Sequence, residues 1–195
     1  MTDEALMLAV RDGDVAQLGA LFERYHTALF DFLSRTTGDR TVAEDLVQDV
    51  FVRILKYRRT FRDDSCFEAW VFGISRNART DHFRKRGAVE PLGDRDLDVA
   101  APGPSQAQRF EAGRDSKRLK RALLLLADDK RELLVLARYQ QMSYEHIGAV
   151  LGIEVGAVKV RVHRAVKELR EIFLRLSDGD EAWNAKKSGT DLRII

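Results

Sequence analysis

The chain has 195 residues, enough for one ordinary domain or two small ones. Hydrophobic residues make up 45% and charged residues 33% of the sequence, which is typical of a helical protein with large exposed faces. The net charge is only +2 and says little about affinity for nucleic acid, so the distribution of the charges must decide. The single cysteine, Cys66, excludes an internal disulfide and leaves a zinc site without its usual ligands. The lack of a long apolar run predicts a cytoplasmic protein with no secretory signal and no membrane span.

Amphipathic repeats predict two helices early in the chain. Residues 18–33 form the first run, which ends near Gly38. In the second helix, Thr41 and Glu44 fit a capping box, which predicts that the helix starts at Val42. Its apolar positions recur at spacings of three and four and therefore share one face: Val42, Leu46, Val47, Val50, Phe51, Ile54 and Leu55.

A loop and a third helix complete the first unit. The loop spans residues 57–66, and the helix over residues 67–86 is apolar at its start and basic at its end. All three prolines fall within the following stretch, residues 87–106, which has no lasting apolar period and is typical of a linker.

The second unit contains a helix-turn-helix pattern. Helices are predicted over residues 119–126 and 128–139, followed by a short helix over 143–151 and a longer basic helix over 155–174. Between the last two lies Gly152, where the turn needs a residue that tolerates positive φ.

The sequence therefore predicts an all-α fold with two small helical domains joined by a flexible linker. The second is a helix-turn-helix domain of winged-helix-like type. The expected boundaries are 1–86 for the first domain, 87–106 for the linker, 107–176 for the second domain and 177–195 for a flexible C-terminal tail.

Charge is unevenly placed on these helices. The last helix carries a basic face, which suits the major groove of DNA better than a merely solvated surface because it occurs together with the turn and an apolar stripe. The helix after Thr41 carries acidic and amide side chains, which suit a basic protein partner rather than DNA. The loop and the third helix interleave cations with aromatic rings, as expected for contact with unstacked bases, although several of these rings are equally expected in the core.

Four segments, in order, resemble the extracytoplasmic-function group of bacterial RNA polymerase sigma factors. They are AEDLVQDVFVRIL (43–55), YRRTFRDDSC (57–66), FEAWVFGISRNARTDHFRKR (67–86) and SYEHIGAVLGIEVGAVKVRVHRAVKELR (143–170). The resemblance implies a promoter-reading subunit with no enzymatic activity and no cofactor. The implied partners are core RNA polymerase (the clamp of its largest subunit and the flap of its second-largest subunit), promoter DNA and an anti-sigma factor.

The charge and aromatic patterns and the resemblance together assign three sets of residues and no metal ligand. The polymerase-binding set is Glu44, Asp45, Gln48, Asp49 and Phe51, with Phe51 expected to pack in the core. The minus-ten set is Phe61, Arg62, Asp63, Ser65, Trp70, Arg76, Asn77, Arg79, Thr80, His82, Arg84 and Lys85, while Asp81 is expected to orient neighbouring cations. The minus-thirty-five set is Lys159, Arg161, His163, Arg164 and Lys167.

Two alternatives stay open at this stage. A stand-alone helix-turn-helix regulator explains the second unit equally well, but it does not explain the acidic helix beside a basic, aromatic loop. A nucleic-acid enzyme would need a nucleotide or metal site, and the sequence has no phosphate-binding glycine loop and no HExxH motif. Glu154 replaces a serine common in the family at the start of the recognition helix, so the promoter sequence is left open.

Overall fold

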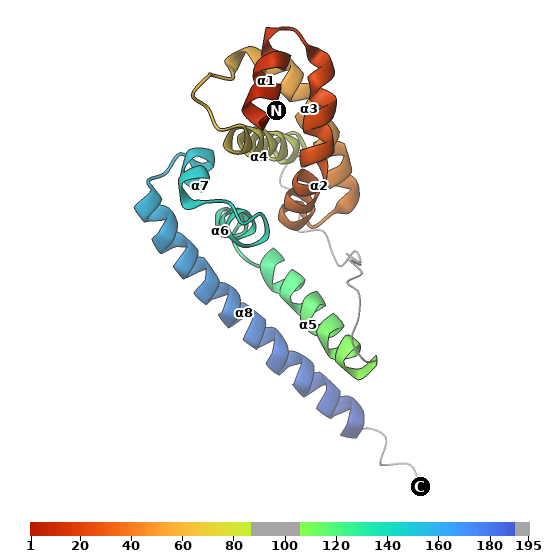
Figure 1. Cartoon of the computed structure of the whole chain (residues 1–195). Coiled ribbons are helices and arrows are strands. Elements are labelled where there is room, and N and C mark those ends of the chain that lie inside the picture. Colours follow the sequence, from red (N-terminus) through yellow and green to blue (C-terminus); the bar gives the residue numbers. More distant parts are fainter. Residues whose placement is uncertain (87–105, 190–195) are drawn as a thin grey trace.

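The computed structural model describes the backbone of residues 1–86 and 106–189, and the side chains of residues 1–85 and 114–177. Every regular element in these ranges is helical (Figure 1), which confirms the predicted all-α fold. The described part of the second domain contains no strand, so its helix-turn-helix has no wing there. The predicted linker lies outside the described residues, except for Gln106, with which a helix begins.

Four helices build the first domain, joined in part by two short 3-10 turns. The helices are α1 (Asp3–Asp12), α2 (Leu18–Thr37), α3 (Arg40–Tyr57) and α4 (Phe67–Arg86), and the turns are Val15–Gln17 and Arg58–Thr60. The limits of α4 are those the sequence predicts. The apolar stripe of α3 is buried against α2 and α4, also as predicted.

The first helix, α1, was not predicted from the sequence. The Thr2 hydroxyl accepts a hydrogen bond from the Ala5 N–H at 3.2 Å and caps the helix, and two acidic residues in the first turn suit its positive end. Leu6, Met7 and Val10 recur at spacings of one and three and are all buried. The packing of these three side chains fixes α1 on the rest of the domain.

The start of α3 corrects a sequence prediction. The capping residue is Asp39, whose carboxylate accepts hydrogen bonds from the Thr41 and Val42 N–H groups at 2.9 and 3.2 Å, and the helix begins at Arg40. The capping box that begins at Thr41 is therefore wrong, because an aspartate two residues earlier satisfies the same free donors.

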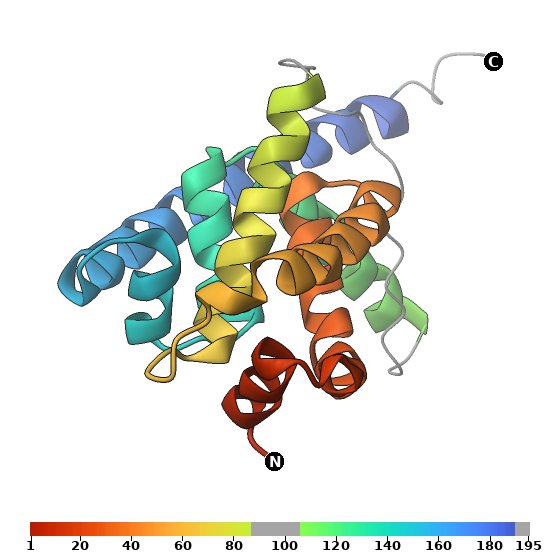
Figure 2. The same cartoon turned by 90° about the horizontal axis from the view of Figure 1, so that it is seen from above.

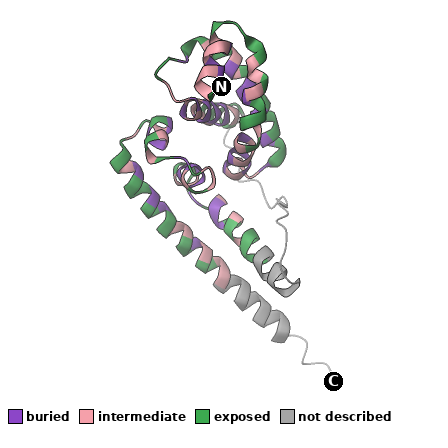
Figure 3. Cartoon of the chain, in the orientation of Figure 1, coloured by how far each residue is buried: buried purple, intermediate pink, exposed green. Residues whose placement is uncertain are grey.

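The second domain consists of helices around the helix-turn-helix. They are α5 (Gln106–Leu124), α6 (Asp128–Leu134), a π-helical turn (Val135–Tyr139), α7 (Tyr144–Leu151) and α8 (Val155–Gly189). α5 packs along α8 (Figure 1). Buried positions recur along the first part of α8 between exposed ones (Figure 3). α8 continues to Gly189, so the prediction that this helix ends at residue 174 is wrong.

The turn between α7 and α8 depends on two glycines. Gly152 ends α7 with φ 66°, the left-handed conformation that the sequence analysis expected. At Gly148, an added Cβ would lie 2.8 Å from the carbonyl oxygen of Ile153. The chain therefore turns tightly because the backbone can approach Gly148 closely.

The two domains pack against each other along α4 and α2. α4 lies beside α7, and α2 contacts α5, α6 and the π-helical turn (Figure 2). Polar contacts connect the surfaces: Arg131 donates to the Thr36 carbonyl at 2.9 Å, and the Arg35 guanidinium stacks 3.9 Å from the centre of the Tyr139 ring. This closed arrangement determines which candidate residues are accessible.

Candidate functional site

The acidic surface of α3 is displayed to solvent. Glu44, Asp45 and Gln48 are exposed, whereas Asp49 is half-buried and accepts a hydrogen bond from Arg53 at 2.9 Å. Phe51 is buried and its ring lies 4.9 Å from that of Phe22, as expected of a core residue. The exposed carboxylates are therefore available to a basic partner.

An apolar side chain lies on this helix where the sequence analysis did not look for one. Val52 is 63% exposed and comes one helical turn after Gln48 and Asp49. Buried apolar anchors surrounded by polar residues carry much of the energy of protein interfaces. The only sequence signal for Val52 is that it falls outside the apolar stripe of α3.

The loop before α4 corrects one assignment. Phe61 is 2% exposed, and its ring packs 5.3 Å from Trp70 and 6.1 Å from Phe67. Phe61 is therefore a core residue in this arrangement and cannot contact a base. Trp70 is half-buried at the edge of the same aromatic cluster.

Some polar residues of the loop form hydrogen bonds or ion pairs with nearby side chains. Asp63 accepts a hydrogen bond from Arg11, which also donates to the Phe61 carbonyl at 3.3 Å and so ties the loop to α1. Arg62 is exposed and lies 3.3 Å from Asp64, whereas Ser65 is half-buried. The Arg11 contact fixes the loop to α1 and leaves Arg62 at the surface.

The accessible part of the predicted minus-ten face follows the second half of α4. Asn77, Thr80, Arg84 and Lys85 are exposed and His82 is half-buried. Their alignment along one basic helix end suits contact with a nucleic-acid backbone.

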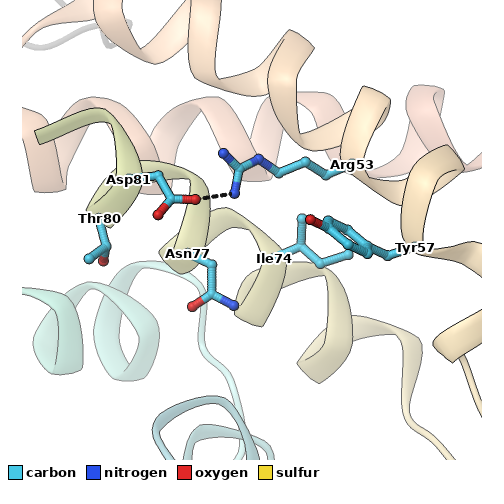
Figure 4. A pocket seen from close by; sticks show the side chains of 6 residues that line it. All are labelled: Arg53, Tyr57, Ile74, Asn77, Thr80 and Asp81. Carbon is cyan, nitrogen blue, oxygen red and sulfur yellow. Dashed lines mark hydrogen bonds and ion pairs between the residues drawn. The ribbon is translucent and has the colours of Figure 1, made fainter. Parts of the chain in front are cut away.

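A pocket between α3 and α4 borders this face (Figure 4). Arg53, Tyr57, Ile74, Asn77, Thr80 and Asp81 line it. Arg53 donates to Asp81 at 2.8 Å across its wall, and this hydrogen bond lowers the pKa of Asp81 below its usual value. Asp81 also accepts from Arg84 at 2.9 Å, so it orients neighbouring cations as the sequence analysis expected.

Two other members of the minus-ten set face the second domain. Arg79 is 6% exposed and its Nη2 lies 3.4 Å from an oxygen of Glu132 on α6, which is 3% exposed. Arg76 approaches the same carboxylate at 3.2 Å. Nε and Nη1 of Arg79 are buried without a hydrogen-bond partner among the described residues. In this arrangement Glu132 covers Arg79 and closes it off from solvent.

The predicted minus-thirty-five face lies on the first part of α8 and is open to solvent. Its five members, Lys159, Arg161, His163, Arg164 and Lys167, are all exposed. Val158, Val162 and Ala165 lie on the opposite side and are buried. The helix therefore presents a cationic face to solvent, and the major groove of DNA admits an α-helix.

Comparisons with known proteins identify both domains. The family described as Sigma-70 region 2 matches residues 21–89, and the family described as Sigma-70, region 4, matches residues 116–169. The RNA polymerase sigma factor CarQ of Myxococcus xanthus is 32% identical over 163 residues, which cover 84% of this chain and 92% of that protein. The ECF RNA polymerase sigma factor SigF of Caulobacter vibrioides is 32% identical over 185 residues, or 90% and 96% of the two chains.

Solved structures agree with this result. CnrH in complex with the cytosolic domain of CnrY is similar with a TM-score of 0.64 and 29% identity, over 91% of this chain and 98% of that chain. The sigma factor RpoE in complex with the anti-sigma factor NepR, from Bartonella quintana, gives a TM-score of 0.61 and 31% identity, over 79% and 94%. Among the helices that the structure describes, none is long and apolar enough to cross a membrane. The charged surfaces of α3, α4 and α8 thus lie on a sigma-type scaffold, and the chain belongs to the extracytoplasmic-function group of RNA polymerase sigma factors, which are transcription initiation factors and not enzymes.

Proposed function

We propose that the surfaces of α3, of α4 with its preceding loop, and of α8 each make one of the contacts needed for promoter recognition. The acidic surface of α3 (Glu44, Asp45, Gln48 and Asp49) docks on core RNA polymerase, with Val52 as its apolar anchor. The loop and α4 bind the minus-ten element, and α8 binds the minus-thirty-five element. The observation that carries this division is the separation of charge: exposed carboxylates on α3 against exposed cations on α4 and α8.

The domain boundaries follow the same division. Residues 1–86 form the polymerase-docking and minus-ten domain, and residues 107–176 form the minus-thirty-five domain. The linker (87–106) lets both domains reach their elements on one promoter, because tethering on polymerase raises the effective concentration of each domain at its own site. Residues 177–195 form a C-terminal extension, and the chain acts in the cytoplasm.

Promoter binding requires the two domains to separate. Arg76 and Arg79 must leave Glu132 before they can contact DNA, so the closed arrangement is a resting form. Binding of unstacked bases and polymerase contacts supply the energy for opening DNA, and this chain hydrolyses no nucleotide. The similar chains CnrH and RpoE were each solved with a partner, and for RpoE it is an anti-sigma factor. An anti-sigma protein that holds this chain closed is therefore its expected regulator.

The decisive experiment measures binding to core polymerase. Wild-type chain should co-elute with core enzyme on a sizing column and direct initiation at a specific promoter, and Asp45→Arg should weaken binding by at least about tenfold because it reverses one charge in the docking surface. Glu145→Gln, which removes an exposed carboxylate from α7 in the other domain, is the matched control and should bind normally. Equal binding by Asp45→Arg and wild type would remove α3 as the docking surface. Binding of the chain to palindromic duplex without polymerase would favour a stand-alone regulator.

A further inference from the structure

A cluster of three metal-ligand residues lies where the two domains meet. Cys66 precedes α4 and Glu68 lies in its first turn, whereas His146 comes from α7 in the second domain. His146 Nδ1 is 2.7 Å from Glu68 Oε2 and 3.8 Å from Cys66 Sγ, and one donor atom from each residue lies within 4.8 Å of the others. His146 lies 78 positions after Glu68 and 80 after Cys66, so no local spacing in the sequence could indicate the cluster.

These are the donor types that zinc prefers. Thiolate, imidazole and carboxylate bind zinc at about 2.0–2.3 Å in tetrahedral geometry, which places neighbouring donors roughly 3.3–3.6 Å apart. The Cys66–His146 distance must therefore shorten slightly, and the Glu68–His146 distance must widen to admit an ion.

The surroundings favour a cation that enters from solvent. The Glu68 and His146 side chains are 33% and 39% exposed, so an ion can reach them and a water can take the fourth position. A second carboxylate is close, because Glu4 accepts a hydrogen bond from the N–H of Phe67, the residue between Cys66 and Glu68. Three protein ligands and a water make a site that can exchange its metal.

We propose that Cys66, Glu68 and His146 form an interdomain zinc site that locks the chain in its closed arrangement. Two ligands belong to the minus-ten domain and one to the minus-thirty-five domain, so the bound ion opposes their separation. While the lock holds, Arg79 stays against Glu132 and cannot contact DNA. Metal binding itself stands apart from promoter recognition, but its regulatory consequence rests on the proposed function.

A bound ion would add to the contacts that hold the closed arrangement. Arg79 has two buried nitrogens without hydrogen-bond partners among the described residues, and polar contacts such as that from Gln140 to Asp31 at 3.1 Å join the domains. Relative motion of two domains is expected unless their interface is large and apolar. A ligand that binds only the closed form shifts the equilibrium by its full differential affinity.

The first test measures metal binding directly. The full chain, stripped with a chelator and desalted, is titrated with cobalt(II) and then with zinc in competition with a chromogenic chelator. Wild type should bind one ion per chain and show a thiolate-to-cobalt charge-transfer band. Cys66→Ser should lose the band, and Cys66→Ser, Glu68→Gln and His146→Ala should each bind zinc at least about tenfold more weakly. Glu145→Gln, next to His146 but outside the cluster, is the control and should bind as wild type does.

Either failure of this test overturns the site. It is refuted if wild type shows no cobalt band, or if zinc affinity survives in Cys66→Ser and in His146→Ala. Thermal unfolding of each variant shows whether weaker metal binding results from the lost ligand or from misfolding. Each of the three variants tests one ligand separately.

The second test measures the lock. Zinc should reduce the radius of gyration of wild type in solution scattering and should lower its affinity for core polymerase by about 5- to 150-fold, the range of ordinary allosteric coupling. Neither change should occur in His146→Ala. Zinc binding without these effects would overturn the lock. A metal-free wild type that fails to direct transcription would instead refute the proposed function.

Discussion

The pairing of Arg76 and Arg79 with Glu132 predicts how one substitution shifts the chain between closed and open arrangements. Glu132→Gln keeps the side-chain shape but removes the charge that both arginines face at 3.2 and 3.4 Å. Removing one partner of a buried ion pair costs about 3–5 kcal/mol when the other charge must stay buried. Here the cost is smaller, because the domains can separate and return Arg79 to water.

The expected effect is about 1–3 kcal/mol in favour of opening, or roughly 5- to 150-fold in the closed-to-open ratio. Glu132→Gln should therefore increase the radius of gyration of the free chain and raise its apparent affinity for core polymerase and promoter. Small-angle scattering and fluorescence anisotropy measure the two quantities separately.

Glu168→Gln provides the control for this substitution. Glu168 pairs with Lys130 inside the second domain, and both side chains are more than a third exposed. Its replacement removes a solvent-screened surface ion pair, which contributes little to stability, and leaves the domain interface unchanged. If Glu132→Gln and Glu168→Gln have the same radius and the same polymerase affinity, the contact between α4 and α6 does not hold the closed form.

Three further substitutions test individual positions. Phe61→Ala should destabilise the first domain by about 3–5 kcal/mol in thermal unfolding, since it empties a buried aromatic cluster; a normal melting temperature together with defective promoter opening would return Phe61 to the DNA surface. Gly148→Ala should cost roughly 1–3 kcal/mol, because its Cβ would lie 2.8 Å from the Ile153 carbonyl oxygen, and unchanged stability would disprove the close approach. Lys159→Ala should leave core-polymerase binding intact and reduce the slope of promoter affinity against salt by about 1, whereas an unchanged slope would mean that Lys159 contacts no phosphate.

Local patterns predicted much of the fold. The apolar stripe of α3, the limits of α4 and the position of Gly152 follow from spacing and backbone preference, because each depends on neighbours within a few residues. Even there, the sequence placed the start of α3 at a capping box when Asp39 provides the cap. A helix begins where a side chain reaches the free N–H donors, and spacing alone cannot show whether Asp39 or Thr41 does so.

Tertiary contacts, within a domain or between the two, could not be predicted from spacing. Phe61 was placed in the minus-ten set from the resemblance and from the interleaved cations and rings, a pattern that left core packing equally expected. In the structure the rings of Trp70 and Phe67 pack around it. Arg79 was assigned to the minus-ten face on its position in α4, which remains its proposed role. The sequence gives no sign that Glu132, 53 residues later, covers it in the free chain.

The closed arrangement leaves the proposed polymerase-docking surface accessible while it covers part of the proposed DNA surface. Glu44, Asp45 and Gln48 are exposed, yet Arg79 is buried against Glu132. Core polymerase can therefore make its first contact with the resting chain through α3, whereas its full affinity and promoter binding both require the domains to separate. Arg79 cannot contact Glu132 and a phosphate at the same time, so DNA binding by the free chain requires the free energy of domain separation. In the complex with polymerase, contacts to both domains offset this free energy. This order would confine promoter recognition to the holoenzyme, and an interdomain metal would raise the free energy needed to separate the domains.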